Sequence, residues 1–106
     1  MEIMLKYLRV GKDGQVIIIK NVSTRKTLPL ILSARFIANK VDKNIKEHLS
    51  REELSTYSLL KKDVFVARFN EIIRDGFVER NDDEIKVRNI LLIERFLENF
   101  EEKGKV

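Results

Sequence analysis

The sequence contains no cysteine, one histidine, one proline and four glycines in 106 residues. Without cysteine there is no disulfide framework and no thiolate metal site. The chain also lacks a nucleophile motif, a Gly-rich phosphate loop and any metal-ligand spacing, so we expect neither an enzyme nor a bound metal or cofactor. The one histidine, His48, has no cysteine or second histidine with which to build a charge-relay site.

Long apolar runs are missing as well. No stretch approaches the roughly 18 apolar residues of a membrane-spanning helix, and the first residues lack the apolar centre of a signal peptide. These absences predict a cytoplasmic protein with no membrane partner. No repeat, low-complexity run or Pro/Gly/Ser linker divides the chain, and its length suits a single domain over residues 1–106.

Charged residues are abundant by contrast. They make up 36% of the chain, against roughly 25% in an average domain, and with few loop-breaking residues this is typical of heat-adapted proteins. The net charge is +4 and the pI is near 9.4. Residues 1–80 carry 16 Lys and Arg against 10 Asp and Glu, whereas residues 81–106 carry 5 against 7. The basic excess in the first three-quarters suits a polyanionic partner.

Two β-rich runs predict an N-terminal hairpin over residues 3–22. They read IMLKYLRV and QVIIIKNV, and the GKDG between them places a glycine at each end of a short loop. Residues 16–19 are all β-branched, so both faces of that strand are expected to need a cover from the domain or from a second subunit.

An apolar stripe predicts the first helix over residues 29–47, with Thr27 as its N-cap and Pro29 near its first turn. The stripe comprises Leu30, Ala34, Ile37, Val41 and Ile45. Arg35 is one of the polar residues that lie off it. His48 is expected near the C-terminus of this helix, where a cation is mildly favourable.

A capping box of Ser50 and Glu53 predicts a short second helix over residues 51–59. Asp63 is expected to cap a third helix, whose apolar face carries Phe65, Phe69, Ile72 and Ile73. That helix should end at Gly76, because glycine has no Cβ to clash in the left-handed conformation that closes many helices.

Residues 77–80 and 84–88 then read as two strands around a turn, and residues 89–103 as a last helix. The order predicts an α+β fold, with a strand pair, three helices, a second strand pair and a long C-terminal helix.

This order, and above all the stretch RFNEIIRDGFVER, resembles the winged helix-turn-helix DNA-binding domain of small archaeal transcriptional regulators, although no individual family is identified. The resemblance covers residues 28–88. Residues 1–27 are an added β-hairpin, and residues 89–106 resemble a dimerisation helix. It therefore implies a homodimer that binds duplex DNA and regulates transcription.

In such domains the exposed face of the third helix reads the major groove. A helical wheel places these residues opposite Phe65 and Phe69: Val64, Ala67, Arg68, Glu71 and Arg74. Arg68 is the candidate for a guanine or phosphate contact, and Lys61 and Lys62 for phosphates. The full set of nucleic-acid-binding candidates is Arg51, Lys61, Lys62, Val64, Arg68, Arg80, Lys86 and Arg88. The candidate dimer interface is Leu92, Ile93, Phe96, Leu97 and Phe100.

The expected wing tip is acidic and departs from the basic tips usual in this fold. Asp82, Asp83 and Glu84 would repel phosphates, so the tip should point away from DNA. An acidic tip and a mild net charge equally fit a winged-helix module that docks onto proteins of a replication or transcription complex. A viral or mobile-element protein of the same fold is a third alternative. Asp82 and Asp83 could chelate a divalent cation; the alternative, which is far commoner, is an ordinary solvated acidic turn.

Overall fold

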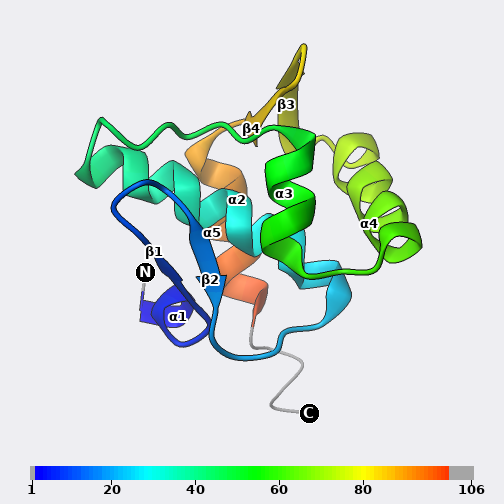
Figure 1. The fold of residues 1–106 in the computed structure, drawn as a ribbon, viewed down its shortest axis with the longest axis horizontal. Coiled ribbons are helices and arrows are strands. Elements are labelled where there is room, and N and C mark those ends of the chain that lie inside the picture. Colours follow the sequence, from blue (N-terminus) through cyan, green and yellow to red (C-terminus); the bar gives the residue numbers. More distant parts are fainter. Residues whose placement is uncertain (1, 101–106) are drawn as a thin grey trace.

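The computed structural model describes residues 2–100 (Figure 1). In chain order its elements are α1 (Glu2–Leu5), β1 (Leu8–Val10), β2 (Val16–Ile18), α2 (Thr24–Val41), α3 (Arg51–Ser58), α4 (Lys62–Arg74), β3 (Val78–Asn81), β4 (Glu84–Val87) and α5 (Ile90–Phe100). The domain is compact and α+β, with two small antiparallel hairpins, as the sequence predicted. No helix within residues 2–100 combines the length and apolar content that crossing a bilayer requires.

The N-terminal hairpin is present but shorter than predicted. β1 and β2 are antiparallel, with Leu8 opposite Ile18, and Gly14 has a φ of +87° in the loop between them. The prediction that the first strand starts at residue 3 is wrong, because the helix α1 occupies that position and buries Met4 in the core. Ile17 on β2 is 54% exposed, so residues 2–100 cover only one face of this strand.

Helix α2 begins five residues earlier than predicted. Ser23 occupies the N-cap position, and Pro29 lies inside the helix. Thr27 is not the cap, because its hydroxyl donates a 2.9 Å hydrogen bond to the Ser23 carbonyl from within the first turns. Leu28, next to the proline, is fully buried. Packing of this early turn against the core outweighs the hydrogen bond that proline removes.

The other end of α2 also differs from the prediction. The helix stops at Val41 instead of residue 47, because Asp42 is extended and its carboxylate accepts a 3.0 Å hydrogen bond from the Asn44 N–H, which competes with helical bonding. Val41 is 82% exposed and does not extend the apolar stripe. His48 therefore lies in the connection to α3, where its Nε2 is 3.3 Å from Glu84 Oε2.

Arg35 lies inside the domain although its position is off the apolar stripe. Its guanidinium donates to the carbonyls of Gly14 at 3.0 Å, Lys46 at 2.9 Å and His48 at 3.3 Å. Burial lowers the pKa of this guanidinium, and the negative charge of Glu53 partly opposes the shift. Arg35 thus fixes the hairpin loop and the α2–α3 connection against α2.

The capping box of α3 is confirmed. The Glu53 N–H donates to Ser50 Oγ, and the Ser50 N–H donates to Glu53 Oε1, both at 3.0 Å. The helix ends at Ser58, one residue before the predicted end, because Leu59 adopts a left-handed φ of +60°.

Helix α4 follows after a short turn. Lys61 occupies its N-cap position, so the prediction that Asp63 caps it is wrong; Asp63 lies in the first turn, where a carboxylate favours the helix dipole. Phe65 and Phe69 are buried and stacked, with ring centroids 5.5 Å apart. Gly76 has a φ of +75° just after the helix, which confirms the predicted stop.

The second hairpin pairs β3 with β4, with Val78 opposite Val87. Leu49, in the connection before α3, forms an antiparallel bridge with Ile85 through two 2.8 Å hydrogen bonds, and both side chains are fully buried. Leu49 therefore extends this sheet on the outer side of β4. In Figure 1 the β3–β4 hairpin projects beyond the helices, near the end of α4.

Helix α5 closes the core. Asn89 Oδ1 accepts a hydrogen bond from the Leu92 N–H at its start, and Ile93 and Phe100 are 1% and 3% exposed. The Phe100 ring meets Tyr7 edge-on at 5.0 Å, which joins the helix to the N-terminal hairpin. The predicted end of this helix at residue 103 lies outside the described residues.

Candidate nucleic-acid interface

Helix α4 presents one polar stripe to solvent. Four of its exposed residues follow one another at spacings of four, three and four positions, which places them on one side of the helix: Asp63, Ala67, Asn70 and Arg74. Lys62 and Ile73 are exposed beside this stripe; the prediction that Ile73 belongs to the apolar face is wrong, because its side chain is 36% exposed. Val64, Arg68 and Glu71 are only half-exposed, so the outward face is rotated away from them. The helical wheel correctly placed Ala67 and Arg74 on the exposed face and was wrong for Val64, Arg68 and Glu71, because α4 packs against α2 as well as through its phenylalanines.

Asn70 is the residue that the sequence reasoning missed. Its side chain is exposed in the middle of the α4 stripe, and asparagine can pair bidentately with adenine in the major groove. The spacing of Asn70 from Ala67 and Arg74 was visible in the sequence, but it becomes informative only once the buried sector of the helix is known.

Arg68 is engaged within the chain. Its Nη1 lies 2.9 and 2.8 Å from the two carboxylate oxygens of Glu71, and Arg25 of α2 pairs with the same carboxylate at 3.2 Å. The Arg68 side chain is 20% exposed, whereas that of Arg25 is 72% exposed. We refer to these three residues as the Glu71 cluster. In the Glu71 cluster one carboxylate pairs with two cations that would otherwise be available to bind phosphates.

Lys61 and Lys62 lie where α4 begins, and both are exposed. Within residues 2–100 neither ammonium group has an ion pair or hydrogen bond, so both charges are available to a partner. Arg74, at the opposite end of α4, is exposed and has no such partner in the same range.

Arg51 and Arg80 come from different elements and meet over the same ring. The guanidinium carbon of Arg51 is 4.9 Å from the Phe69 ring centroid, and that of Arg80 is 5.7 Å away. Cation–π contact positions a guanidinium while leaving its N–H donors available to other acceptors. The structure therefore brings the start of α3 and the strand β3 together beside α4.

The two other wing cations have partners of their own. Lys86 Nζ donates to Glu47 Oε1 at 3.0 Å, and this hydrogen bond raises the pKa of the lysine. The Arg88 guanidinium donates to the carbonyls of Gly76 at 3.1 Å and Val78 at 3.3 Å. Lys86 and Arg88 thus hold the wing to the domain.

The wing tip is exposed and acidic, as its sequence indicated. Asp82 has a φ of +61° in the turn, and Asp83 and Glu84 are exposed beside it. In the part of the chain that the structure describes, no three acidic, histidine or cysteine side chains are grouped to hold a metal ion.

The five candidate dimer residues divide into two groups. Ile93 and Phe100 are buried in the core of their own chain. Leu92, Phe96 and Leu97 are half-buried. A partner chain could therefore reach only the second group without rearrangement of the core.

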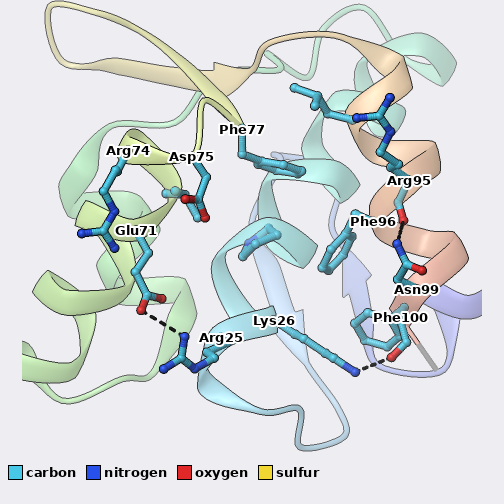
Figure 2. A pocket seen from close by; sticks show the side chains of 13 residues that line it. Arg25, Lys26, Glu71, Arg74, Asp75, Phe77, Arg95, Phe96, Asn99 and Phe100 are labelled. Carbon is cyan, nitrogen blue, oxygen red and sulfur yellow. Dashed lines mark hydrogen bonds and ion pairs between the residues drawn. The ribbon is translucent and has the colours of Figure 1, made fainter. Parts of the chain in front are cut away.

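A groove of about 670 Å³ lies between the start of α2, the end of α4 and α5 (Figure 2). Its apolar lining is Pro29, Ile72, Phe77, Leu92, Phe96 and Phe100. Its charged lining is Arg25, Lys26, Glu71, Arg74, Asp75 and Arg95. We refer to it as the α2–α5 groove. In Figure 2 the rings of Phe77 and Phe96 face the open space, with Glu71 and Asp75 on the α4 side.

The seven basic candidate residues therefore fall into three sets, and the eighth candidate, Val64, is half-buried on α4. Lys61, Lys62, Arg51 and Arg80 are exposed around α4, Arg68 is paired with Glu71, and the last two wing cations brace the hairpin. Comparison of the chain with protein-family models, with curated proteins and with solved structures finds no match in any of the three.

Proposed function

We propose that the chain is a winged-helix protein that binds duplex DNA through α4 and acts in transcription regulation. The order of α2, α3, α4 and the β3–β4 hairpin supports this proposal. So does the Leu49–Ile85 bridge, which adds a third strand segment to the hairpin, between α2 and α3 in the chain. A winged helix uses this arrangement to hold its third helix at the surface.

The observation that carries the proposal is the surroundings of the exposed α4 stripe. Lys61, Lys62 and Arg74 lie at the two ends of the helix, and Arg51 and Arg80 lie over the Phe69 ring, on the side of the helix next to the exposed stripe's buried flank. These cations come from the helix, from α3 and from the wing. In the proposed complex they contact phosphates, and Asn70 is the side chain placed to read a base.

The test is binding to random and selected duplexes across a range of salt concentrations. Each phosphate neutralised contributes about −0.9 to the slope of log affinity against log salt. Changing Lys61 and Lys62 together to alanine should weaken binding to all sequences alike and flatten the slope by about one unit per lost contact. The matched control replaces Lys12 and Lys43, two exposed lysines in other loops, with alanine and should keep the slope of the parent protein.

Asn70→Ala separates base reading from phosphate binding. It should cost about 1–3 kcal/mol on a preferred site and little on random duplex if Asn70 pairs with adenine. Equal losses on both duplexes would remove Asn70 from the set of base-reading residues.

A second candidate function is protein docking within a replication or transcription complex. The acidic tip at Asp82 and Asp83 and the occupation of Arg68 by Glu71 favour it, since both reduce the attraction of the surface for phosphates. An absence of duplex binding at about 50 mM salt, where phosphate contacts are strong, would reject the DNA proposal and leave docking as the better account.

We also propose that the protein forms a homodimer. Ile17 and Ile19 on and beside β2 are 54% and 51% exposed, and a second copy could cover them by packing against this face of the hairpin. Light scattering at micromolar protein should report twice the chain mass. Ile17→Lys should then give a folded monomer, whereas a monomeric parent protein would exclude the dimer.

A further inference from the structure

The α2–α5 groove has the size of a small-molecule site. Its volume of about 670 Å³ falls within the roughly 300–1,000 Å³ of pockets that bind metabolites and drugs. The Phe96 ring lies edge-on to Phe77 at 6.0 Å and to Phe100 at 5.3 Å. These contacts form an aromatic surface on which a flat apolar group can stack.

The charges around this surface favour an anion. Four cations line the groove against two carboxylates. One of those carboxylates, Glu71, is already shared by Arg25 and by Arg68 behind it. Arg74 and Arg95 have no ion pair within residues 2–100, so the groove has positive charge to spare.

Two of the four cations come from the first turn of α2, which contains no acidic residue. In Figure 2 Arg25 reaches toward Glu71 on the α4 side, whereas Lys26 reaches toward Phe100 on the α5 side, next to the aromatic surface. Lys26 donates to the Phe100 carbonyl and its Nζ is 4.7 Å from the centroid of that ring. An ammonium group has three donors, so Lys26 retains donors for a ligand next to the aromatic surface.

At the α4 end the groove is less favourable to anions. The Asp75 carboxylate lines it there, and within residues 2–100 that side chain has no hydrogen-bond partner. A long acidic peptide would bring negative charge to Asp75, whereas a small molecule with one carboxylate would not. The groove therefore suits a small molecule with one carboxylate better than a long acidic peptide.

We propose that the α2–α5 groove binds a small aromatic carboxylate, with its acid group at Lys26 and its ring against Phe77 and Phe96. The site is separate from the exposed stripe of α4, and the proposal does not rest on DNA binding. Because the groove includes the end of α4 and Arg25 of the Glu71 cluster, a ligand there would contact the helix that is proposed to read DNA.

The experiment is amide NMR titration of the whole chain, without DNA, with three probes of one shape. These are 2-naphthoate, the neutral 2-naphthylmethanol and the cationic 2-naphthylmethylamine. The shifts should map to residues that line the groove. Naphthoate should bind about fivefold more tightly than the alcohol, as expected for an exposed ion pair, and the amine should bind most weakly.

The variant Lys26→Gln should remove that preference and equalise the affinities for acid and alcohol. The control Lys12→Gln makes the same charge change elsewhere and should retain the preference. Equal binding of acid and alcohol by the parent protein, tighter binding of the amine, or no binding would each overturn the proposal. Amide shifts of the groove residues that change with protein concentration and not with ligand concentration would show that a second copy of the chain occupies the groove. That result would also overturn the proposal.

Discussion

Replacing Glu71 with glutamine removes a carboxylate that forms ion pairs with two arginines within residues 2–100. In the folded chain Glu71 contacts Arg68 at 2.8 Å and Arg25 at 3.2 Å. Glutamine has nearly the same shape and still accepts a hydrogen bond, but it carries no charge to hold either guanidinium. We therefore expect Glu71→Gln to bind duplex DNA more tightly than the parent protein.

The size of the gain follows from counterion release. At about 0.1 M salt, one additional phosphate contact with a slope of about 0.9 raises affinity about eightfold, and two such contacts raise it about sixtyfold. Arg25 is 72% exposed and can turn toward a phosphate freely, whereas Arg68 is 20% exposed. The expected gain is therefore closer to eightfold, with a slope steeper by about one unit in each chain.

Fluorescence anisotropy with labelled random duplex at several salt concentrations measures both quantities. The control is Glu94→Gln on the exposed surface of α5, which makes the same change in net charge away from the cluster. A thermal melt should show that Glu71→Gln loses at most about 1 kcal/mol, because the ion pairs are partly solvated. If Glu71→Gln and Glu94→Gln bind alike, the Glu71 cluster does not restrain DNA binding and the reasoning fails.

Four further predictions concern stability. Arg35→Met should cost about 3 kcal/mol or more in urea denaturation, because one buried and two partly buried carbonyls lose a charged donor; a loss below about 1 kcal/mol would show that water replaces the guanidinium. Ile93→Ala should cost about 2–5 kcal/mol, whereas Leu91→Ala, which is 63% exposed, should stay within about 0.5 kcal/mol of the parent. Gly76→Ala should cost about 1–2 kcal/mol from its backbone alone, since its φ is +75° and an added Cβ meets no atom within 4 Å. Lys86→Met should destabilise the fold by less than about 1 kcal/mol at neutral pH. Because the folded-state pKa of Lys86 is raised, the stability that its charge contributes is complete below the ordinary value of 10.5 and is lost as pH rises through the folded-state pKa.

The elements whose signals are local were predictable from the sequence. The capping box joins Ser50 to Glu53 within one turn, and Gly76 ends α4 through its own backbone freedom. The β3–β4 hairpin has its strands and its turn in ten consecutive residues, 78–87. In each case the interacting groups are close in sequence, so pattern and residue type determine the element.

The tertiary structure decided the features that join distant segments. The early start of α2 depends on burial of Leu28, and the place of Arg35 in the interior depends on carbonyls brought from two loops. The Leu49–Ile85 bridge, 36 positions apart in the sequence, adds to the wing sheet and leaves no periodic signal.

The candidate site divides in the same way. The sequence by itself determined which residues are basic, and Lys61 and Lys62 are exposed where it placed them. Whether a charge is free depends on its neighbours in space: Arg25 lies 46 positions from Glu71, yet both it and Arg68 share that carboxylate. Only packing of α2 against α4 brings those groups within 3.2 Å, because Coulomb attraction and hydrogen bonding act through short distances in space and not along the chain.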